Sequence, residues 1–280
     1  LCKQLALRVP VDRNGFCDQL LEREIGRLGA IEYRLLQIGR KEGEANQAAA
    51  ILGGGRCPAD GLVTTVAFDH GMSAAQGTRP APVSVLLYHR LAPDEAYARI
   101  TGDERVYTVA VSRFRAHMEA LRAHGWRVVS TSELLAHVTG RRPLTEPSVL
   151  ISFDDGCASV ARHALPVLRE LGLPALLFVV SDPAAKLFAE LTDRDRRVSD
   201  DEIRALDAAG VTIGSHSAGH RPLVGLGAGE LDRELSGSKH ALEQALGKPV
   251  TTFGVPYGIY GVEVRRAAER AGYEAVFTSE

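Results

Sequence analysis

One stretch of the sequence decides most of the fold: SVLISFDDG, residues 148–156. Its first six residues form a largely apolar run, which is typical of a parallel strand covered on both faces. Asp154, Asp155 and Gly156 follow directly, so two carboxylates stand at the end of a buried strand. In α/β folds the carboxyl ends of the strands carry the chemistry. This stretch therefore predicts both a parallel sheet and the place of a functional site.

Six more short apolar runs share this character. They lie at residues 83–88, 127–130, 175–180, 211–215, 251–255 and 274–278. Helical patterns fall between them near residues 113–124, 131–138, 159–172, 200–209, 229–246 and 261–271. Ser199 and Glu202 predict a capping box at the start of one of these helices. Seven strands separated by helices predict an α/β fold, either a barrel or a doubly wound sheet.

Residues 1–80 have a different character and predict a mainly helical N-terminal extension. Apolar residues at spacings of three and four indicate an amphipathic helix from about residue 18 to residue 50. Four glycines inside it each cost up to about 1 kcal/mol relative to alanine; they are Gly26, Gly29, Gly39 and Gly43. The stretch TRPAP at residues 78–82 is typical of a linker. The chain is thus expected to divide into an extension, residues 1–80, to which no chemistry is assigned, and a domain at residues 83–280.

Composition and charge narrow the class of protein. With 45% hydrophobic and 24% charged residues, the chain has the composition of an ordinary globular protein. The formal net charge of -2 provides no basic field for nucleic acid, and no apolar run approaches the roughly 18 residues of a membrane span. Four scattered cysteines favour free thiols and a cytoplasmic location. A secreted or periplasmic location stays open because the chain starts at Leu1.

The ends of four predicted strands carry side chains suited to chemistry. They are Asp154 and Asp155 after residues 148–153, His216 after 211–215, Pro256 and Tyr257 after 251–255, and His89 after 83–88. Because the carboxyl ends of parallel strands meet at one edge of a sheet, we expect these groups to converge.

His216 and His220 stand in His-x-x-x-His spacing, which can bring both imidazoles to one point. Two histidines and a carboxylate are a common catalytic metal set that leaves a position open for water, and Asp155 is the natural third ligand. Asp154 then serves as the general base. Taken alone, the histidine pair suits a helix surface equally well, and Asp-Asp-Gly is more often a turn. Their joint placement after buried strands favours the metal site.

Three motifs together resemble a known family. SFDDG (152–156), HSAGH (216–220) and VPYG (255–258) are similar, in order and spacing, to the N-terminal motifs of the polysaccharide deacetylases, the NodB-homology carbohydrate esterases. The resemblance covers about residues 83–280. It implies a distorted seven-stranded (β/α) barrel. It also implies hydrolysis of N-acetyl, sometimes O-acetyl, groups on chitin, peptidoglycan, exopolysaccharides or smaller amino sugars.

The resemblance also implies roles for individual residues. Asp154 is the base, and Asp155, His216 and His220 bind one divalent metal ion. Zinc is the first choice, and cobalt, nickel or iron are alternatives because this ligand set suits several metals. Pro256 and Tyr257 line the substrate groove, and the Tyr257 backbone N–H helps to hold the oxyanion.

Two departures from the family pattern point to one subgroup. The Arg that usually precedes the Pro-Tyr pair is missing from Phe253-Gly254-Val255, and the later motifs that supply the general acid would lie beyond Thr278. A circularly permuted subgroup, similar to the poly-N-acetylglucosamine deacetylases, commonly lacks this Arg and opens with a strand ending in Tyr-His. Leu87-Tyr88-His89 matches that opening. By this resemblance His89 is the general acid and Tyr88 belongs to the substrate groove.

Other polar motifs have simpler interpretations. FDHG at residues 68–71 lacks partner ligands and is expected to form a turn. DRDRR at residues 193–197 is expected to be a solvated loop. His117 and His137 lie on predicted helices and are expected to be surface or helix-end residues.

The leading functional hypothesis is a metal-dependent de-N-acetylase acting on an N-acetylated sugar or glycan, with no nucleic-acid partner. One alternative is another amide hydrolase on the same site, such as a deformylase or a cyclic-imide hydrolase. The other is a sugar-binding pseudoenzyme, since the family's later motifs are absent. The sequence does not predict the oligomeric state.

Overall fold

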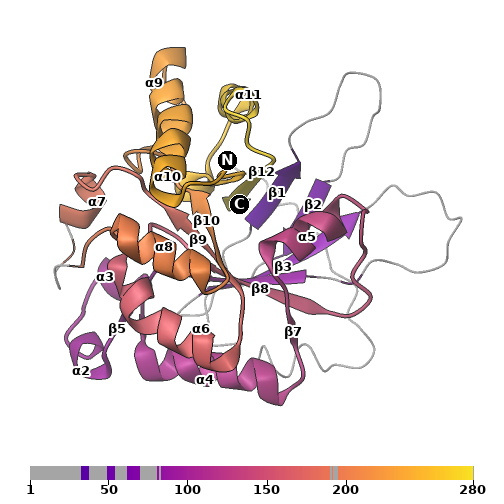
Figure 1. The fold of residues 1–280 in the computed structure, drawn as a ribbon, viewed down its shortest axis with the longest axis vertical. Coiled ribbons are helices and arrows are strands. Elements are labelled where there is room, and N and C mark those ends of the chain that lie inside the picture. The colour runs from indigo at the N-terminus through magenta and orange to yellow at the C-terminus, as the bar shows by residue number, and fades with distance from the viewer. Residues whose placement is uncertain are drawn as a thin grey trace, which may run out of the picture.

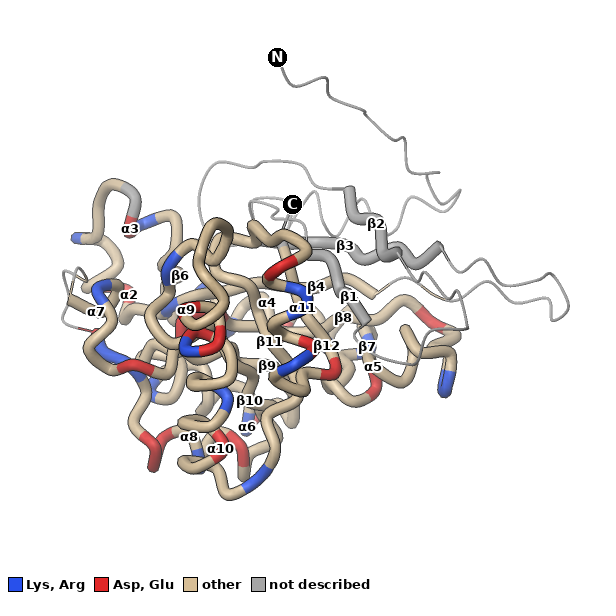
Figure 2. Tube along the Cα trace, turned by 90° about the horizontal axis from the view of Figure 1, so that it is seen from above, with Lys and Arg blue, Asp and Glu red and all other residues tan. Residues whose placement is uncertain are grey.

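The structure is a computed structural model. It describes residues 81, 83–189, 191 and 195–279, together with the strand backbones at residues 33–37, 49–53 and 62–69. Among the described residues, no helix has the length and apolar character that crossing a membrane requires. Basic and acidic residues are interspersed over the described chain (Figure 2), in keeping with the nearly balanced charge.

A curled, mostly parallel sheet forms the centre of the molecule (Figure 1). Its parallel strands, in spatial order, are β4 (Val83–Tyr88), β8 (Ser148–Phe153), β9 (Ala175–Val179), β10 (Val211–Ser215), β11 (Thr252–Gly254) and β12 (Ala275–Ser279). β7 (Arg127–Val128) pairs with the start of β8. The seven predicted strands are confirmed, and the sheet curls into a half-barrel rather than a flat doubly wound sheet.

The predicted helices are also confirmed, and all but α5, whose Leu134 and Val138 pack in the same cluster as Leu87 and Phe178, contribute to the core on the outside of the curl. They are α4 (Val111–Ala123), α5 (Thr131–Val138), η1 (Val160–Ala164) continuing into α6 (Leu165–Leu171), α8 (Asp200–Ala208), α9 (Ala228–Asp232), η2 (Arg233–Gly237) continuing into α10 (Ser238–Leu246), and α11 (Val262–Arg270). The capping box of Ser199 and Glu202 starts α8 as predicted. Figure 1 shows α4, α6, α8 and α10 packed side by side.

Short elements that the sequence patterns do not reveal lie in the loops. They are β5 (Arg90–Ala92), α2 (Asp94–Tyr97), α3 (Asp103–Val106), β6 (Thr108–Ala110), α7 (Lys186–Ala189) and the 3₁₀ turn η3 (Pro256–Gly258). Elements of three or four residues are too short to show a period, so only tertiary contacts define them.

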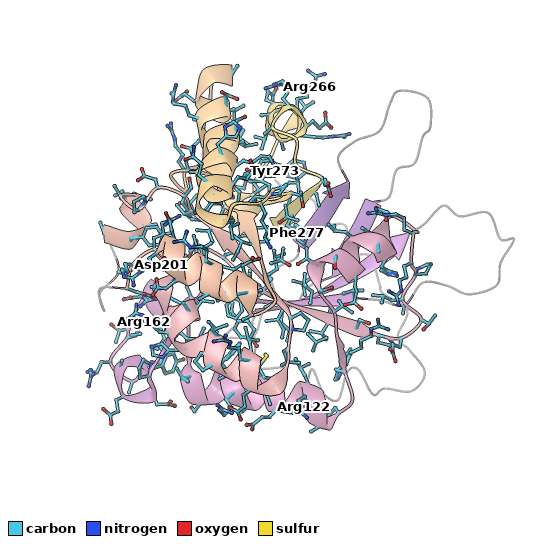
Figure 3. All side chains as sticks on the ribbon, viewed as in Figure 1. Arg122, Arg162, Asp201, Arg266, Tyr273 and Phe277 are labelled. Atoms are coloured by element: carbon cyan, nitrogen blue, oxygen red, sulfur yellow. The ribbon has the colours of Figure 1, made fainter. Side chains whose placement is uncertain are left out.

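The two faces of the strands pack into separate cores. Leu86, Tyr88 and Phe153 face the outer helices, whereas Leu87 and Phe178 face the inside of the curl. Figure 3 shows Phe277 inside, while Arg122, Asp201 and Arg266 project from the outer helices. Because successive side chains of a strand point to opposite faces, this alternation decides which residue at each strand end reaches the inside of the curl.

The described part of the N-terminal region is strand, not helix. β1 (Tyr33–Gln37) pairs antiparallel with β12, and β3 (Leu62–Asp69) pairs with β4 and with β2 (Ala49–Gly53). The predicted helix over residues 18–50 is therefore wrong where it meets β1 and β2, and the rest of it lies outside the described residues. Edge strands present unpaired backbone groups that an added strand satisfies, whereas four glycines weaken a helix. The division at residue 80 stays a prediction.

Candidate metal centre and active site

The ends of four parallel strands are bonded to one another at one edge of the sheet. Tyr88 is paired with Phe153, so the next residues, His89 and Asp154, lie level on neighbouring strands. The Asp154 N–H donates to the Tyr88 carbonyl at 2.9 Å, and the His216 N–H donates to the Val179 carbonyl at 2.9 Å. The predicted convergence of the strand ends is confirmed for these residues.

Asp155, His216 and His220 form a cluster of potential metal ligands. The Oδ1 atom of Asp155 lies 3.3 Å from His220 Nε2 and 3.8 Å from His216 Nε2. One ligand atom from each residue lies within 4.8 Å of the others. Tetrahedral zinc with bonds of 2.0–2.2 Å places neighbouring ligand atoms roughly 3.3–3.5 Å apart. The donor types and their spacing therefore fit a divalent ion.

The protonation of both histidines suits metal binding. His216 Nδ1 lies 2.9 Å from the Gly254 carbonyl, which can only accept, so Nδ1 carries a proton and Nε2 is the nitrogen left to bind a metal ion. Such a backbone contact orients a metal-binding histidine. Burial lowers the pKa of His220 to about 4, with a further contribution from His216, so its imidazole is neutral near pH 7.

Backbone strain is concentrated at this site. Among the described residues, four residues other than glycine have a positive φ: Asp155 at 68°, Ser217 at 66°, His220 at 52° and Tyr257 at 62°. Such left-handed conformations cost on the order of 1–3 kcal/mol each and cluster at functional sites. Two of the four are proposed metal ligands, and the other two lie beside them. The strained backbone conformations thus coincide with the residues that direct side chains into the site.

The Phe178 ring packs against Gly214 and Gly254, next to the His216 ring. A Cβ atom on Gly214 or on Gly254 would lie 2.6 Å or 2.8 Å from the Phe178 ring, so both positions are closed to larger residues. The ring centroid lies 6.2 Å from that of His216. Phe178 therefore fills the space beside Gly254, in the stretch where the family pattern would place an arginine.

Tyr257 stands at the rim of the site. Its ring lies 4.8 Å from the His220 ring, and its hydroxyl donates to the His220 carbonyl at 3.3 Å. The side chain is 56% exposed, so it can meet a ligand. Pro256, the other predicted groove residue of η3, is buried beneath it.

His89 reaches the site from β4, but Tyr88 does not. His89 follows Tyr88 and, because side chains alternate along a strand, lies on the same side as Leu87, toward the inside of the curl. Its ring packs edge-on against Tyr107 at 4.9 Å. Tyr88 is 2% exposed and faces the outer core, where its hydroxyl is hydrogen-bonded to His117 Nδ1 at 3.1 Å. The assignment of the Tyr88 side chain to the groove is therefore wrong.

Two histidines expected at helix surfaces or helix ends are buried, although His137 does lie in the last turn of its helix. His117 bonds Tyr88, and His137 Nδ1 accepts the Leu144 N–H at 2.9 Å. Burial lowers the pKa of His117 to about 4. Their positions on helices α4 and α5 are as predicted, but helix periodicity alone did not place them on the inner face.

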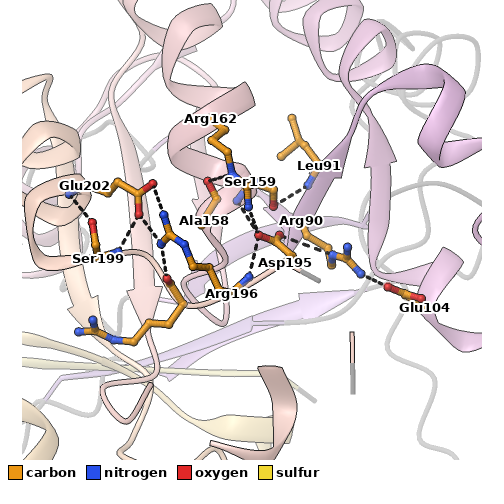
Figure 4. A network of polar contacts seen from close by, with 11 residues as sticks. Arg90, Leu91, Glu104, Ala158, Ser159, Arg162, Asp195, Arg196, Ser199 and Glu202 are labelled. Atoms are coloured by element: carbon orange, nitrogen blue, oxygen red, sulfur yellow. Dashed lines mark hydrogen bonds and ion pairs between the residues drawn. The ribbon is translucent and has the colours of Figure 1, made fainter. Parts of the chain in front are cut away.

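A buried ionic network next to His89 corrects the prediction of a solvated loop at Asp195 (Figure 4), whereas Arg196 is exposed as predicted and residues 193 and 194 lie outside the described residues. Asp195 is only 4% exposed. Its Oδ1 accepts from Arg162 Nη2 at 2.5 Å and from the Ser159 N–H at 3.2 Å, and its Oδ2 lies 3.9 Å from Arg90 Nε. Arg90 is also buried and pairs with Glu104. Arg90, the first residue of β5 and the neighbour of His89, is thus held between Glu104 and Asp195.

Comparison with known proteins identifies the family. Residues 141–276 match the sequence profile of the polysaccharide deacetylases. They include all three motifs that hold the clustered site residues. Over these residues, just under half of its length, this chain matches the polysaccharide deacetylase family.

Individual relatives agree with this assignment. The Bacillus subtilis protein YxkH, whose name assigns it to the polysaccharide deacetylases, is 26% identical over 202 residues, covering 72% of this chain and 66% of its own. The poly-beta-1,6-N-acetyl-D-glucosamine N-deacetylase of Escherichia coli K12 is 28% identical over 124 residues, covering 41% of this chain and 18% of its own. The structure of IcaB from Ammonifex degensii superposes with a TM-score of 0.59 at 25% identity, covering 70% of this chain and 82% of that one. This chain thus spans less than two thirds of the length of either curated relative.

Proposed function

We propose that this protein is a metal-dependent hydrolase that removes N-acetyl groups from an amino sugar or an N-acetylglucosamine-containing glycan. One observation carries the proposal: Asp155, His216 and His220 converge within 4.8 Å, beside Asp154 on the same edge of the sheet. The Escherichia coli relative is named for de-N-acetylation of a glycan of this kind, which supports the substrate class.

Asp155, His216 and His220 would hold the ion, and zinc suits two histidines and one carboxylate. A divalent ion bound there polarises the scissile carbonyl and lowers the pKa of a water molecule. Asp154 Oδ2 lies 3.7 Å from His216 Nε2, so its carboxylate borders the place where the ligand atoms converge. Asp154 accepts the proton of the attacking water as general base.

The remaining steps fall to residues at the rim. As the water oxygen bonds to the acyl carbon, charge develops on the carbonyl oxygen, and the Tyr257 backbone N–H donates to it. The C–N bond then breaks. His89 gives its proton to the amine nitrogen, because an amine anion is too poor a leaving group to depart unprotonated. The products are acetate and the free amino sugar.

The test combines metal analysis with acetate release from N-acetylglucosamine and its oligomers. We expect one divalent ion per chain and acetate release that stops on chelation and returns with zinc or cobalt. Release of formate or opening of a cyclic imide, without acetate release, would instead support another amide hydrolase. Metal and sugar binding without any hydrolysis would support the pseudoenzyme.

A further inference from the structure

A buried carboxylate lies behind the loop that joins the two histidine ligands. Glu234, on η2, is 7% exposed. Its Oε2 atom accepts the backbone N–H of Ala218 at 3.1 Å and that of Gly219 at 2.8 Å. Both donors belong to the three residues between His216 and His220. Neighbouring N–H groups that converge in this way form an anion-binding concavity, and here a side chain of the protein itself fills it.

The two histidines depend on this loop to different degrees. His216 is held by the end of β10, by the Val179 carbonyl and, through Nδ1, by the Gly254 carbonyl at 2.9 Å. His220 has a strained φ of 52° and lies at the far end of the loop. Its N–H donates to Ser217 Oγ at 3.0 Å, within the same loop. Apart from the Tyr257 hydroxyl, which donates to its carbonyl at 3.3 Å, the position of His220 is set by the groups that hold the loop in shape.

Glu234 is well suited to hold that shape. Hydrogen bonds from backbone N–H groups to a carboxylate are charge-assisted and about twice as strong as those between neutral groups. Arg221 Nε, 4.0 Å from Glu234 Oε1, helps to balance the buried charge. Ser238 Oγ donates to the Ser217 carbonyl at 3.0 Å, so all three residues between the two histidines are bonded to η2 or α10.

We propose that Glu234 is a positioning residue of the metal centre: it shapes the loop so that His220 Nε2 meets Asp155 and His216, without itself touching the ion. The inference rests on the proposed metal site. It assigns a role to a residue that none of the three sequence motifs contains. Loss of Glu234 should loosen His220 and leave His216 in place.

The test measures cobalt affinity of the folded protein by competition with a chelator, together with the absorption spectrum of the bound cobalt. Glu234→Ala should bind cobalt about 10–100-fold more weakly, the usual effect of removing a group that orients a ligand, and its spectrum should change as His220 is displaced. Glu234→Gln keeps an oxygen that can accept both N–H groups, so it should recover most of the affinity.

Glu243→Ala is the matched control. Glu243, on α10, also accepts a backbone N–H, that of Val250 at 2.9 Å, but outside the metal loop. It should lose stability without losing cobalt affinity. If Glu234→Ala does not fold, Glu234→Asp, which withdraws the carboxylate by one methylene, carries the same expectation of weaker binding.

The outcomes separate this inference from the proposed function. Wild-type protein that binds no cobalt would overturn the metal site itself. Wild-type binding combined with unchanged affinity in the folded Glu234 variants would overturn only the role of Glu234. An equal loss of affinity in Glu243→Ala would show a general effect of stability and would also overturn it.

Discussion

Replacement of Gly254 by alanine should disturb both the core and the metal centre. The added Cβ would lie 2.8 Å from Phe178 Cγ and 3.0 Å from both Cδ atoms. Ordinary carbon contacts are about 3.5–4.0 Å, so an overlap of roughly 0.5–1 Å must be relieved. Phe178 is confined from another side by the ring of Phe277 at 5.1 Å. Gly254→Ala should therefore cost about 1–3 kcal/mol, the usual effect of overpacking.

The same change should reach the metal through the backbone. The Gly254 carbonyl accepts from His216 Nδ1 at 2.9 Å. A shift of β11 that relieves the clash moves this carbonyl and turns the imidazole. We expect metal affinity to fall by about 10–100-fold, as for other lost contacts that orient a ligand.

Urea unfolding of the metal-free protein measures the first effect, and chelator competition measures the second. The control is Gly229→Ala, at an exposed position of α9 where the added Cβ would meet nothing within 4 Å apart from its own helix backbone. This change should stabilise the protein by about 0.5–1 kcal/mol. Phe178→Leu should partly rescue Gly254→Ala, with a coupling energy of about 0.5–3 kcal/mol. A Gly254→Ala variant as stable as wild type, or additive with Phe178→Leu, would refute the reasoning.

Four further predictions follow from other parts of the site. Asp154→Asn should lower turnover by about 10²–10⁴-fold with metal content unchanged; turnover near that of wild type, measured by acetate release, would rule out the role of base. His89→Ala should be impaired far more on an N-acetyl sugar than on an activated aryl acetate, whose leaving group needs no proton, and equal losses on both substrates would exclude an acid. Asp195→Ala should cost about 3–5 kcal/mol in urea unfolding, because it removes a buried carboxylate that accepts from Arg162 and the Ser159 N–H and lies beside the buried Arg90. A loss under 1 kcal/mol, on the order of an exposed pair, would contradict this. Finally, burial lowers the pKa of His117 from 6.5 to about 4. Between pH 4 and pH 6.5 the unfolded chain therefore binds a proton that the folded chain does not, and the free energy of unfolding should fall as the pH drops through this range. Replacing His117 with glutamine should flatten that part of the stability curve, and an unchanged pH dependence would show that other groups cause it.

The order and kind of most elements could be predicted from the sequence alone. The runs at residues 83–88, 148–153 and 211–215 match β4, β8 and β10 to the residue. Parallel strands inside an α/β fold are covered on both faces, so their sequences are nearly continuous apolar runs that can be recognised directly. The metal ligands could be predicted for a related reason, since their motifs directly follow these buried runs.

Periodicity failed where the decisive partner lies far away in the sequence. Tyr88 and His89 are neighbours in a motif, yet one faces the outer core and the other the inside of the curl. Strand register sets this difference, since successive side chains alternate between faces. The N-terminal strand β1 likewise depends on the edge of β12, which no local pattern near residues 33–37 reveals.

Only the tertiary structure decided what supports the site. Asp195 and Glu234 sit in stretches that look like an ordinary charged loop and an ordinary helix surface, and both are buried against backbone N–H groups. Gly254 is required by the Phe178 ring, which lies 76 positions earlier in the chain. The ligands of a site must have a particular chemistry, so the sequence displays them. The groups that hold those ligands need only the right place in space, and that place exists once the strands have paired and the helices have packed.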